Sequence, residues 1–282
     1  MIGEVKHIIN KLSKKYPSKE AEAISYILFE DLLGYNKIDI FTKTDYHLNA
    51  AESNILNEAA DLALNDVPVQ YITGKCIFLG LSIKVNPSVL IPRQETEFLT
   101  DIIVNENKSE GLQILDLCTG SGCIALGLKK HLINAQVTAV DISENALKTA
   151  NENALLNKLS IDFMQTDITK IENNVWKHGF FDIMVSNPPY VCLSEKTLLA
   201  PNVVNYEPEN ALFVPDQTPL IYYSVILNNC LIFLKSKAKI YFEINENYGQ
   251  EITNLISDYQ LENIRIIQDI NGKNRIATAI KK

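Results

Sequence analysis

Apolar side chains in the first part of the chain recur at helical spacing. Val, Ile, Leu and Ala occupy every third or fourth position in residues 5–12 and again in residues 21–28. Ser18 is placed to cap the second of these helices, and Gly34 follows its end. A third long helix is predicted over residues 50–64, with a shorter one before it. We therefore expect a small helical bundle at the start of the chain.

The pattern changes in residues 71–91, where apolar and β-branched residues alternate with Gly and Pro. Alternation that is broken by turn residues in this way predicts a β-hairpin. We expect the hairpin to join two domains, a helical domain over residues 1–70 and a larger domain over residues 92–282.

Strand-like and helix-like segments alternate in the larger domain. The predicted strands cover residues 113–117, 136–141, 161–165, 180–186, 239–244, 263–268 and 275–280. Helices are predicted over residues 123–132 and 144–156, the second of them capped by Ser143. This order predicts an α/β fold with a doubly wound, seven-stranded, mostly parallel sheet whose last two strands pair antiparallel. Ligands of such sheets bind beyond the carboxyl ends of the strands.

The composition is that of an ordinary globular protein with an acidic balance. Of the 282 residues, 46% are hydrophobic and 21% are charged, and the formal net charge is −8. A protein that follows a nucleic-acid backbone normally has a basic excess. The charge therefore argues against a nucleic-acid partner and favours a neutral or basic protein partner.

Three features predict a cytoplasmic protein without a membrane span. The N-terminal stretch MIGEVKHIINKL is interrupted by charges, so no signal peptide is predicted. The apolar run of residues 220–234 is split by two asparagines and fits a buried helix better than a membrane span. An odd number of cysteines without a CxxC pair suits a reducing compartment and argues against structural zinc. The cysteines are Cys76, Cys118, Cys123, Cys192 and Cys230.

A glycine loop follows the first predicted strand of the sheet, in the stretch DLCTGSGCIA. Gly120 and Gly122 remove side chains where the backbone must approach a ligand closely, and the following helix offers free N–H groups at its start. Together with Ala125, however, these glycines also satisfy the G-x-G-x-x-G/A fingerprint of nicotinamide dinucleotides, and Asp141 follows at about the right distance. The loop by itself leaves the identity of the cofactor open.

Acidic residues at strand ends favour S-adenosylmethionine over a dinucleotide. Asp116, which precedes the loop, would repel a pyrophosphate but attract the ammonium group of a methionyl moiety. Asp141 can accept both ribose hydroxyls of either cofactor and so does not discriminate between them. Asp167 supplies an acceptor where the adenine amino group would lie. The alternative is that Asp116 and Asp141 only cap a helix or a turn.

The stretch SNPPYV ends the predicted strand of residues 180–186. Its two prolines cannot donate backbone hydrogen bonds, and they bias Asn187 away from helix. The Asn187 side-chain oxygen and the Pro188 carbonyl oxygen could hold the two N–H groups of a planar nitrogen and direct its lone pair toward a methyl donor. Pro189 would stiffen this bracket, and Tyr190 would pack on the flat face of the acceptor. The simpler alternative is a turn that ends the strand.

Together, DLCTGSG, Asp141 and NPPY resemble class I methyltransferases that act on planar nitrogen. Further segments along nearly the whole chain are similar to the peptide chain release factor glutamine methyltransferase family. These are PVQYITGKCIF, LIPRQETE, NYEPENAL, FEINENYGQ and DINGKNR. The resemblance implies methylation of the glutamine amide in the Gly-Gly-Gln motif of class 1 release factors, with S-adenosylmethionine as donor and S-adenosylhomocysteine as product. It also implies that the N-terminal domain helps to hold this protein substrate.

The resemblance places site residues on matching positions of this chain. It assigns the cofactor to Cys118, Thr119, Gly120, Ser121, Gly122, Asp141 and Ile168, and the acceptor to Asn187, Pro188, Pro189 and Tyr190. Further candidate cofactor contacts are Asp116, Asp167 and Asn187. Ile168 would form an apolar wall beside the adenine. The chain departs from the family where Cys118 replaces a common Gly, and where Gln94 and Glu95 replace Pro and Asp.

For other charged residues in these segments, a purely structural role must be weighed against a functional one. Arg93 and Glu97 lie near the domain junction, where ion pairing that fixes the hinge explains them at least as well as contact with a ligand does. Glu207, with the proline after it, is expected to shape a loop over the acceptor pocket, and Glu243 is read as a strand-end cap. No histidine falls in a motif, so we expect neither a histidine base nor a metal site.

The sequence also allows other functions. The same bracket would serve an amino-methyltransferase acting on adenine in DNA or RNA, and a ribosomal protein glutamine is another possible acceptor. A binding module without turnover and a nicotinamide oxidoreductase are weaker alternatives.

Overall fold

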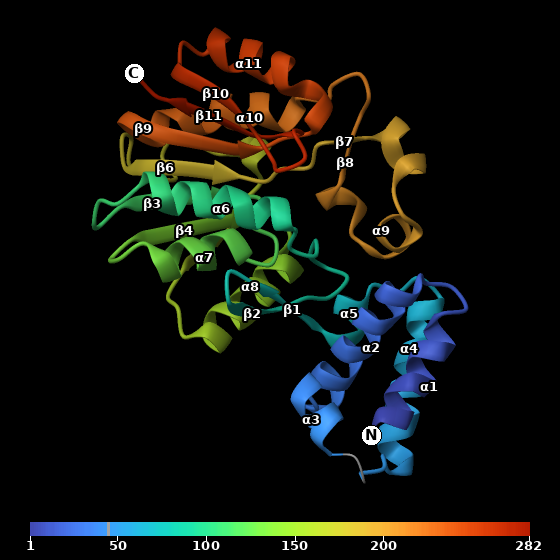
Figure 1. Ribbon diagram of the computed structural model, residues 1–282. Helices are drawn as coiled ribbons and strands as arrows, with labels where there is room; N and C mark the ends of the chain where they lie inside the picture. The colour runs from blue at the N-terminus through green and yellow to red at the C-terminus, as the bar shows by residue number, and fades with distance from the viewer. Residues whose placement is uncertain (44–45) are drawn as a thin grey trace. The chain divides into compact units, whose positions relative to one another are not determined.

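The computed structural model describes residues 1–43 and 46–282. The chain divides into two compact units, one made of Met1–Lys75 with Ala200–Tyr206 and the other of Cys76–Leu199 with Glu207–Lys282 (Figure 1). The short later segment joins the first unit through a hydrogen bond from the Tyr206 hydroxyl to the backbone oxygen of Asn65.

The first unit is helical, as the apolar spacing predicts. Its helices are α1 Ile2–Leu12, α2 Ser18–Leu33, α3 Lys37–Thr42, α4 Ala50–Leu64, α5 Val69–Thr73 and α9 Pro201–Tyr206. Leu12, Leu28 and Leu56 are fully buried among them. Gly34 ends α2 with a left-handed backbone, φ 74°, which glycine adopts without cost.

The prediction that Ser18 caps α2 is wrong. Ser18 is the first helical residue, and Pro17 occupies the capping position with an extended backbone and no side-chain hydrogen bond. The proline side chain has no hydrogen-bond acceptor, so the helix starts without a side-chain cap.

The hairpin is shorter than the segment predicted for it. Its strands are β1 Lys75–Phe78 and β2 Leu81–Lys84, whereas α5 extends the helical region to Thr73. Gly74 ends that helix with a φ of 72°. The strand-like composition of this segment therefore belongs partly to a helix that packs against α2 and α4.

The second unit contains a seven-stranded sheet in the order β10-β11-β9-β6-β3-β4-β5 (Figure 1). The strands are β3 Gln113–Leu117, β4 Gln136–Asp141, β5 Asp162–Gln165, β6 Phe181–Ser186, β9 Leu234–Glu243, β10 Glu262–Gln268 and β11 Asn274–Ile280. All neighbours from β9 to β5 pair parallel, and β11 pairs antiparallel with both β9 and β10. The predicted fold class is confirmed.

Helices flank the sheet and bury its apolar faces. They are α6 Gln94–Glu106, α7 Cys123–His131, α8 Glu144–Asn157, α10 Ile221–Cys230 and α11 Gly249–Asp258. Ser143 caps α8 as predicted, accepting from the Ala146 N–H at 3.2 Å. Tyr223, Phe233 and Phe242 are among the large side chains buried in the core.

The apolar run of residues 220–234 forms α10 and the turn of 3₁₀ helix after it, as expected for a buried helix. Within the described parts of the chain, no helix combines the length and apolar character that crossing a membrane requires.

Candidate active site

The parallel register brings the ends of three neighbouring strands to one edge of the sheet. Leu117 at the end of β3 lies beside Val140 of β4 and Ser186 of β6. The chain leaves β3 through the glycine loop and leaves β6 through the Asn-Pro-Pro-Tyr segment. Two motifs that are far apart in sequence therefore start from adjacent strands.

The glycine loop holds a tight conformation that depends on its glycines. Gly120 and Gly122 have φ values of 55° and 80°. A Cβ on Gly122 would lie 3.1 Å from the Cβ of Ala150, so a side chain there would push α8 away from the loop. The Thr119 N–H donates to the Val140 carbonyl at 2.9 Å and ties the loop to β4.

Cys118 also has a left-handed backbone, with a φ of 62°. A residue with a Cβ is strained in this conformation, by about 1–2 kcal/mol, whereas glycine is not. This accounts for the glycine expected here by resemblance. Burial raises the pKa of the Cys118 thiol, which therefore stays protonated at neutral pH.

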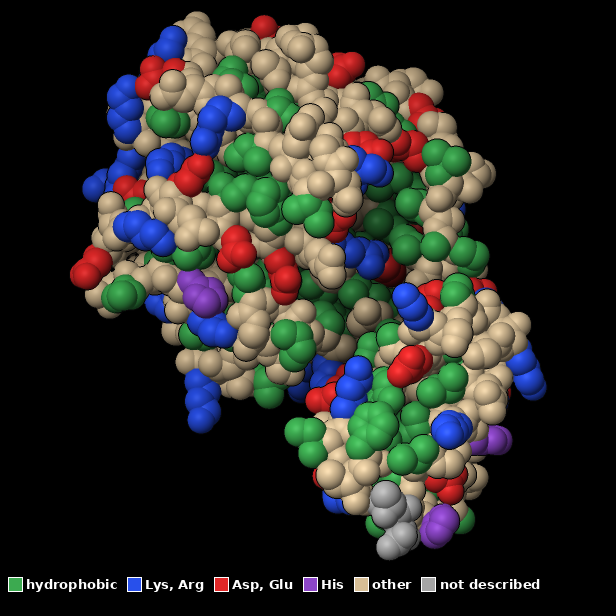
Figure 2. Space-filling view, in the orientation of Figure 1, with side chains coloured by type: hydrophobic (Ala, Val, Ile, Leu, Met, Phe, Trp, Pro, Cys, Tyr) green, Lys and Arg blue, Asp and Glu red, His purple; other side chains and the backbone are tan. Residues whose placement is uncertain are grey.

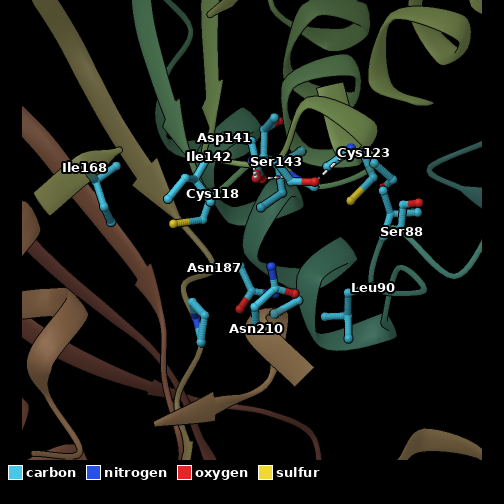
Figure 3. Close-up of a pocket in the computed structure, with 18 of the residues that line it drawn as sticks. Ser88, Leu90, Cys118, Cys123, Asp141, Ile142, Ser143, Ile168, Asn187 and Asn210 are labelled. Atoms are coloured by element: carbon cyan, nitrogen blue, oxygen red, sulfur yellow. Dashed lines mark hydrogen bonds between the residues drawn. The ribbon is translucent and has the colours of Figure 1, made fainter. Parts of the chain in front are cut away.

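A cavity of about 280 Å³ opens beyond these strand ends (Figure 3). The predicted site residues that line it are Cys118, Thr119, Gly120, Ser121, Asp141, Asp167, Ile168, Asn187 and Pro189. Gly122, Asp116, Pro188 and Tyr190 do not line it. The structure thus brings the predicted cofactor loop, two of the three predicted carboxylates and Asn187 to one cavity.

Asp116 lies beneath the loop and is fully buried. Its Oδ2 accepts a hydrogen bond from the Thr119 hydroxyl at 2.6 Å, and its Oδ1 has no hydrogen-bond partner among the described residues. Burial raises the pKa of the Asp116 carboxyl to about 7. A cationic group bound near the loop would favour the charged form of this carboxyl and offset the cost of burying it.

Asp141 ends β4 and faces the cavity while it holds the loop (Figure 3). Its Oδ2 accepts from the Gly120 N–H at 2.8 Å and its Oδ1 from the Ser143 N–H at 2.9 Å. Burial raises the pKa of the Asp141 carboxyl, and these backbone donors oppose the shift. The capping alternative therefore describes part of what Asp141 does, and contact with a ribose stays a prediction.

The third carboxylate is Asp167, which follows β5 and starts a turn of 3₁₀ helix. Its Oδ1 accepts from the Thr169 N–H at 2.9 Å and from the Thr169 hydroxyl at 2.6 Å. These hydrogen bonds lower the pKa of Asp167, so it is ionised at neutral pH. Ile168 beside it is buried and, with Tyr222, gives this end of the cavity an apolar wall.

The acceptor bracket is connected to residues that sequence reasoning missed. Asn187 follows β6, and its Nδ2 donates to the hydroxyl oxygen of Thr96 at 3.3 Å. The Thr96 hydroxyl donates to Glu243 Oε2 at 2.7 Å, and the Tyr190 hydroxyl donates to Glu243 Oε1 at 3.0 Å. Glu243, read from sequence as a cap, therefore joins both sides of the bracket.

Thr96 lies in the segment LIPRQETE, and Asn210, which also lines the cavity, lies in NYEPENAL. Both segments are among those that resemble the family, and this resemblance is the sequence signal that could have identified Thr96 and Asn210 as site residues. Nothing in local periodicity connects either residue with Asn187.

Arg93 and Glu97 have different partners. Glu97 Oε1 accepts from the Leu79 N–H at 2.7 Å, whereas the Arg93 guanidinium forms an ion pair with Glu207. Glu207 also accepts from the Ile91 N–H at 3.1 Å. The expected ion pairing thus involves Glu207, and it ties the segment before Asn210 to the start of α6.

Two protein-family models match parts of the chain. Residues 93–206 match the family described as Methyltransferase small domain, and residues 5–74 match the PrmC N-terminal domain. Among solved structures, a methyltransferase from Pyrococcus furiosus superimposes with a TM-score of 0.51 at 18% identity, over 72% of this chain and 89% of that one. At that identity the likeness shows the fold alone.

Curated relatives have a higher sequence identity to this chain than that solved structure. A release factor glutamine methyltransferase of Bacteroides thetaiotaomicron is 41% identical over 97% of this chain and 97% of its own length. The proteins of the same name from Flavobacterium psychrophilum and Lactococcus lactis are 39% and 37% identical, over 95% and 88% of this chain and 94% and 90% of their own lengths. The chain belongs to the release factor glutamine methyltransferase family.

Proposed function

We propose that this methyltransferase transfers the methyl group of S-adenosylmethionine to the side-chain amide nitrogen of the glutamine in the Gly-Gly-Gln motif of class 1 release factors. The observation that carries the proposal is the position of the Asn187 carboxamide, which lines the same cavity as the glycine loop and Asp141. The names of the relatives support the choice of release factors as substrates.

The cavity fits the proposed cofactor in two respects. Asp116 Oδ1 is a buried acceptor atom without a partner among the described residues, beneath the loop where the methionyl ammonium group is expected. Asp141 and Asp167 face the cavity beside the apolar Ile168, a combination that suits a ribose and an adenine. The cofactor, when bound, supplies an electrophilic methyl group on a positively charged sulfur.

Asn187 would act on the acceptor by orienting it. An amide nitrogen is a weak nucleophile because its lone pair is delocalised into the carbonyl. Hydrogen bonds from its two N–H groups to Asn187 Oδ1 and the Pro188 carbonyl oxygen would fix its lone pair toward the methyl group and stabilise the charge that develops on nitrogen. Formation of the carbon–nitrogen bond would break the carbon–sulfur bond of the donor and leave S-adenosylhomocysteine. The nitrogen then loses a proton to solvent, so the step needs no strong base.

The proposed substrate also bears on partner and location. Release factors act on ribosomes, so we place the reaction in the cytoplasm, and we assign to the helical unit a part in holding the release factor. On the face drawn in Figure 2, acidic and basic side chains are interspersed, which suits a protein partner better than a nucleic-acid backbone.

The test is methylation with labelled S-adenosylmethionine of a release factor, of the same factor with its motif glutamine replaced by alanine, and of DNA and RNA. We expect label in the unmodified factor alone, and mass spectrometry should place one methyl group on the motif glutamine. Label in nucleic acid, or equal label in the alanine variant, would contradict the proposal.

A further inference from the structure

Two hydroxyl groups converge on the side chain of Glu243, at the end of strand β9. Glu243 is 1% exposed. The Thr96 hydroxyl donates to its Oε2 at 2.7 Å and the Tyr190 hydroxyl donates to its Oε1 at 3.0 Å. Burial raises the pKa of the Glu243 carboxyl, and the hydrogen bonds from Thr96 and Tyr190 oppose that shift by favouring the ionised form. In the ionised form the carboxylate can only accept hydrogen bonds, so both hydroxyl protons point toward it.

In this arrangement the Thr96 hydroxyl can form further hydrogen bonds only as an acceptor. A hydroxyl has one proton, and that of Thr96 is directed to Glu243, so its oxygen presents lone pairs elsewhere. Asn187 Nδ2 lies 3.3 Å from that oxygen. If the Asn187 carboxamide were flipped by 180°, its Oδ1 would face these lone pairs, and no hydrogen bond would form. The network therefore determines which end of the carboxamide faces Thr96.

We propose that Thr96 and Glu243 are positioning residues, which make Asn187 present its carbonyl oxygen, and not its amino group, to the acceptor amide. The inference rests on the proposed function of Asn187. A flipped carboxamide would set its amino group against the N–H groups of the glutamine, where neither side can accept. Methyl transfer would then lose the hydrogen bond that orients the lone pair, although the cofactor pocket would be intact.

Regular secondary structure holds both Glu243 and Thr96 in place. Glu243 pairs with Ile276 of the neighbouring strand β11, and its backbone oxygen accepts from the buried Tyr223 hydroxyl at 2.9 Å. Thr96 lies in the first turn of α6 and is 2% exposed. Because strand and helix fix both ends, the hydroxyl of Thr96 is held in place and can specify the orientation of Asn187.

The decisive variant is Thr96→Val, which keeps the shape of the side chain and removes the hydroxyl. We expect its single-turnover methyl transfer to a release factor, at saturating cofactor and substrate, to fall about 10- to 100-fold, since misorientation of a reacting group has effects of this size. Affinity for S-adenosylhomocysteine should change less than about threefold, because Asp141 and the loop are untouched. Thr96→Ser restores the hydroxyl and should recover most of the rate.

Thr100→Val is the matched control, since it makes the same change at a buried threonine of the same helix whose hydroxyl donates to a backbone carbonyl, that of Thr96. It should transfer methyl at nearly the wild-type rate. Glu243→Gln is a second probe, because its side chain has one carbonyl oxygen for two hydroxyl donors. It should slow transfer while S-adenosylhomocysteine still binds.

A readout independent of turnover is the side-chain amide signal of Asn187 in nitrogen-15 NMR, identified by its loss in Asn187→Ala. We expect the signal to shift, and its protons to exchange faster with solvent, in Thr96→Val but not in Thr96→Ser or Thr100→Val. An unchanged signal in Thr96→Val, or a wild-type rate in that variant, would overturn the inference. The NMR result holds whether or not release factors are the substrate, so it separates failure of this inference from failure of the proposed function.

Discussion

The guanidinium of Arg93 forms an ion pair with the carboxylate of Glu207, and the two residues are 114 positions apart in the chain. The Glu207 side chain is 1% exposed and that of Arg93 is 34% exposed. A buried carboxylate is costly unless it is paired, and here one cation and the Ile91 N–H satisfy it. The pair anchors the segment that carries Asn210 to the wall of the cavity.

We predict that Arg93→Ala lowers the free energy of unfolding by about 2–4 kcal/mol, because it leaves the charge of Glu207 buried and uncompensated. Binding of S-adenosylhomocysteine should weaken as well, since the anchored segment contributes to the cavity wall. Urea unfolding and calorimetry would measure the two effects.

Lys196→Ala provides the control, because it breaks an ion pair with Glu209, whose side chain is 69% exposed. That loss should be below about 1 kcal/mol, as for other exposed pairs. Equal losses in the two variants would contradict the role assigned to burial of Glu207.

The second prediction concerns Asp116 and pH. Burial raises the pKa of its carboxyl from 3.8 to about 7, so the folded protein binds this proton more tightly than the unfolded chain does. The contribution of Asp116 to stability is therefore most favourable below pH 3.8, decreases as the pH rises toward 7, and is then constant. The total loss is on the order of 4 kcal/mol, since one pKa unit corresponds to about 1.4 kcal/mol.

Asp116→Asn removes this proton linkage. In the absence of ligand, the variant should be more stable than the wild type at pH 8, and the difference between the two should shrink toward pH 4. Unfolding curves at a series of pH values would give this difference directly. A difference that does not depend on pH would show that Asp116 has an ordinary pKa in the folded protein.

Asp141→Ala should weaken binding of S-adenosylmethionine by about 1.5–3 kcal/mol, because it removes a charge-assisted acceptor. The structure adds a second cause, since the Gly120 and Ser143 N–H groups lose their acceptor at the same time. Calorimetry with the folded variant is the measurement. Unchanged affinity would show that Asp141 acts only as a cap.

Asn187→Ala should slow single-turnover methylation by roughly 100-fold or more, by analogy with the removal of one aimed polar group in other active sites. Cofactor affinity should change less, because the glycine loop and Asp141 stay in place. Tyr190→Ala offers a contrast: loss of its ring should weaken binding of the release factor, seen as a higher KM, and loss of its hydroxyl from Glu243 should slow transfer less than Asn187→Ala does. If Asn187→Ala transfers methyl at the wild-type rate, the segment is only a turn that ends β6.

Most of the fold could be predicted from the sequence, because the signals are local. Apolar periodicity and turn residues distinguish strands from helices over a few positions, and the alternation of the two is typical of a parallel sheet. The same holds for the loop at Gly120 and Gly122, whose positive φ values are the reason that glycine is needed there. Pro188 and Pro189 likewise mark the end of β6 by their own chemistry.

Only the tertiary structure determines which side chains from distant parts of the chain contact one another. Thr96 meets Glu243 across 147 positions and Asn187 across 91. No local pattern indicates the left-handed backbone of Cys118, or that Asp116 Oδ1 has no partner among the residues that the structure describes. Such contacts depend on where the sheet brings its strand ends together and on how deeply each carboxylate is buried. Local sequence determines which element a residue joins, whereas hydrogen bonds between elements follow from how those elements pack.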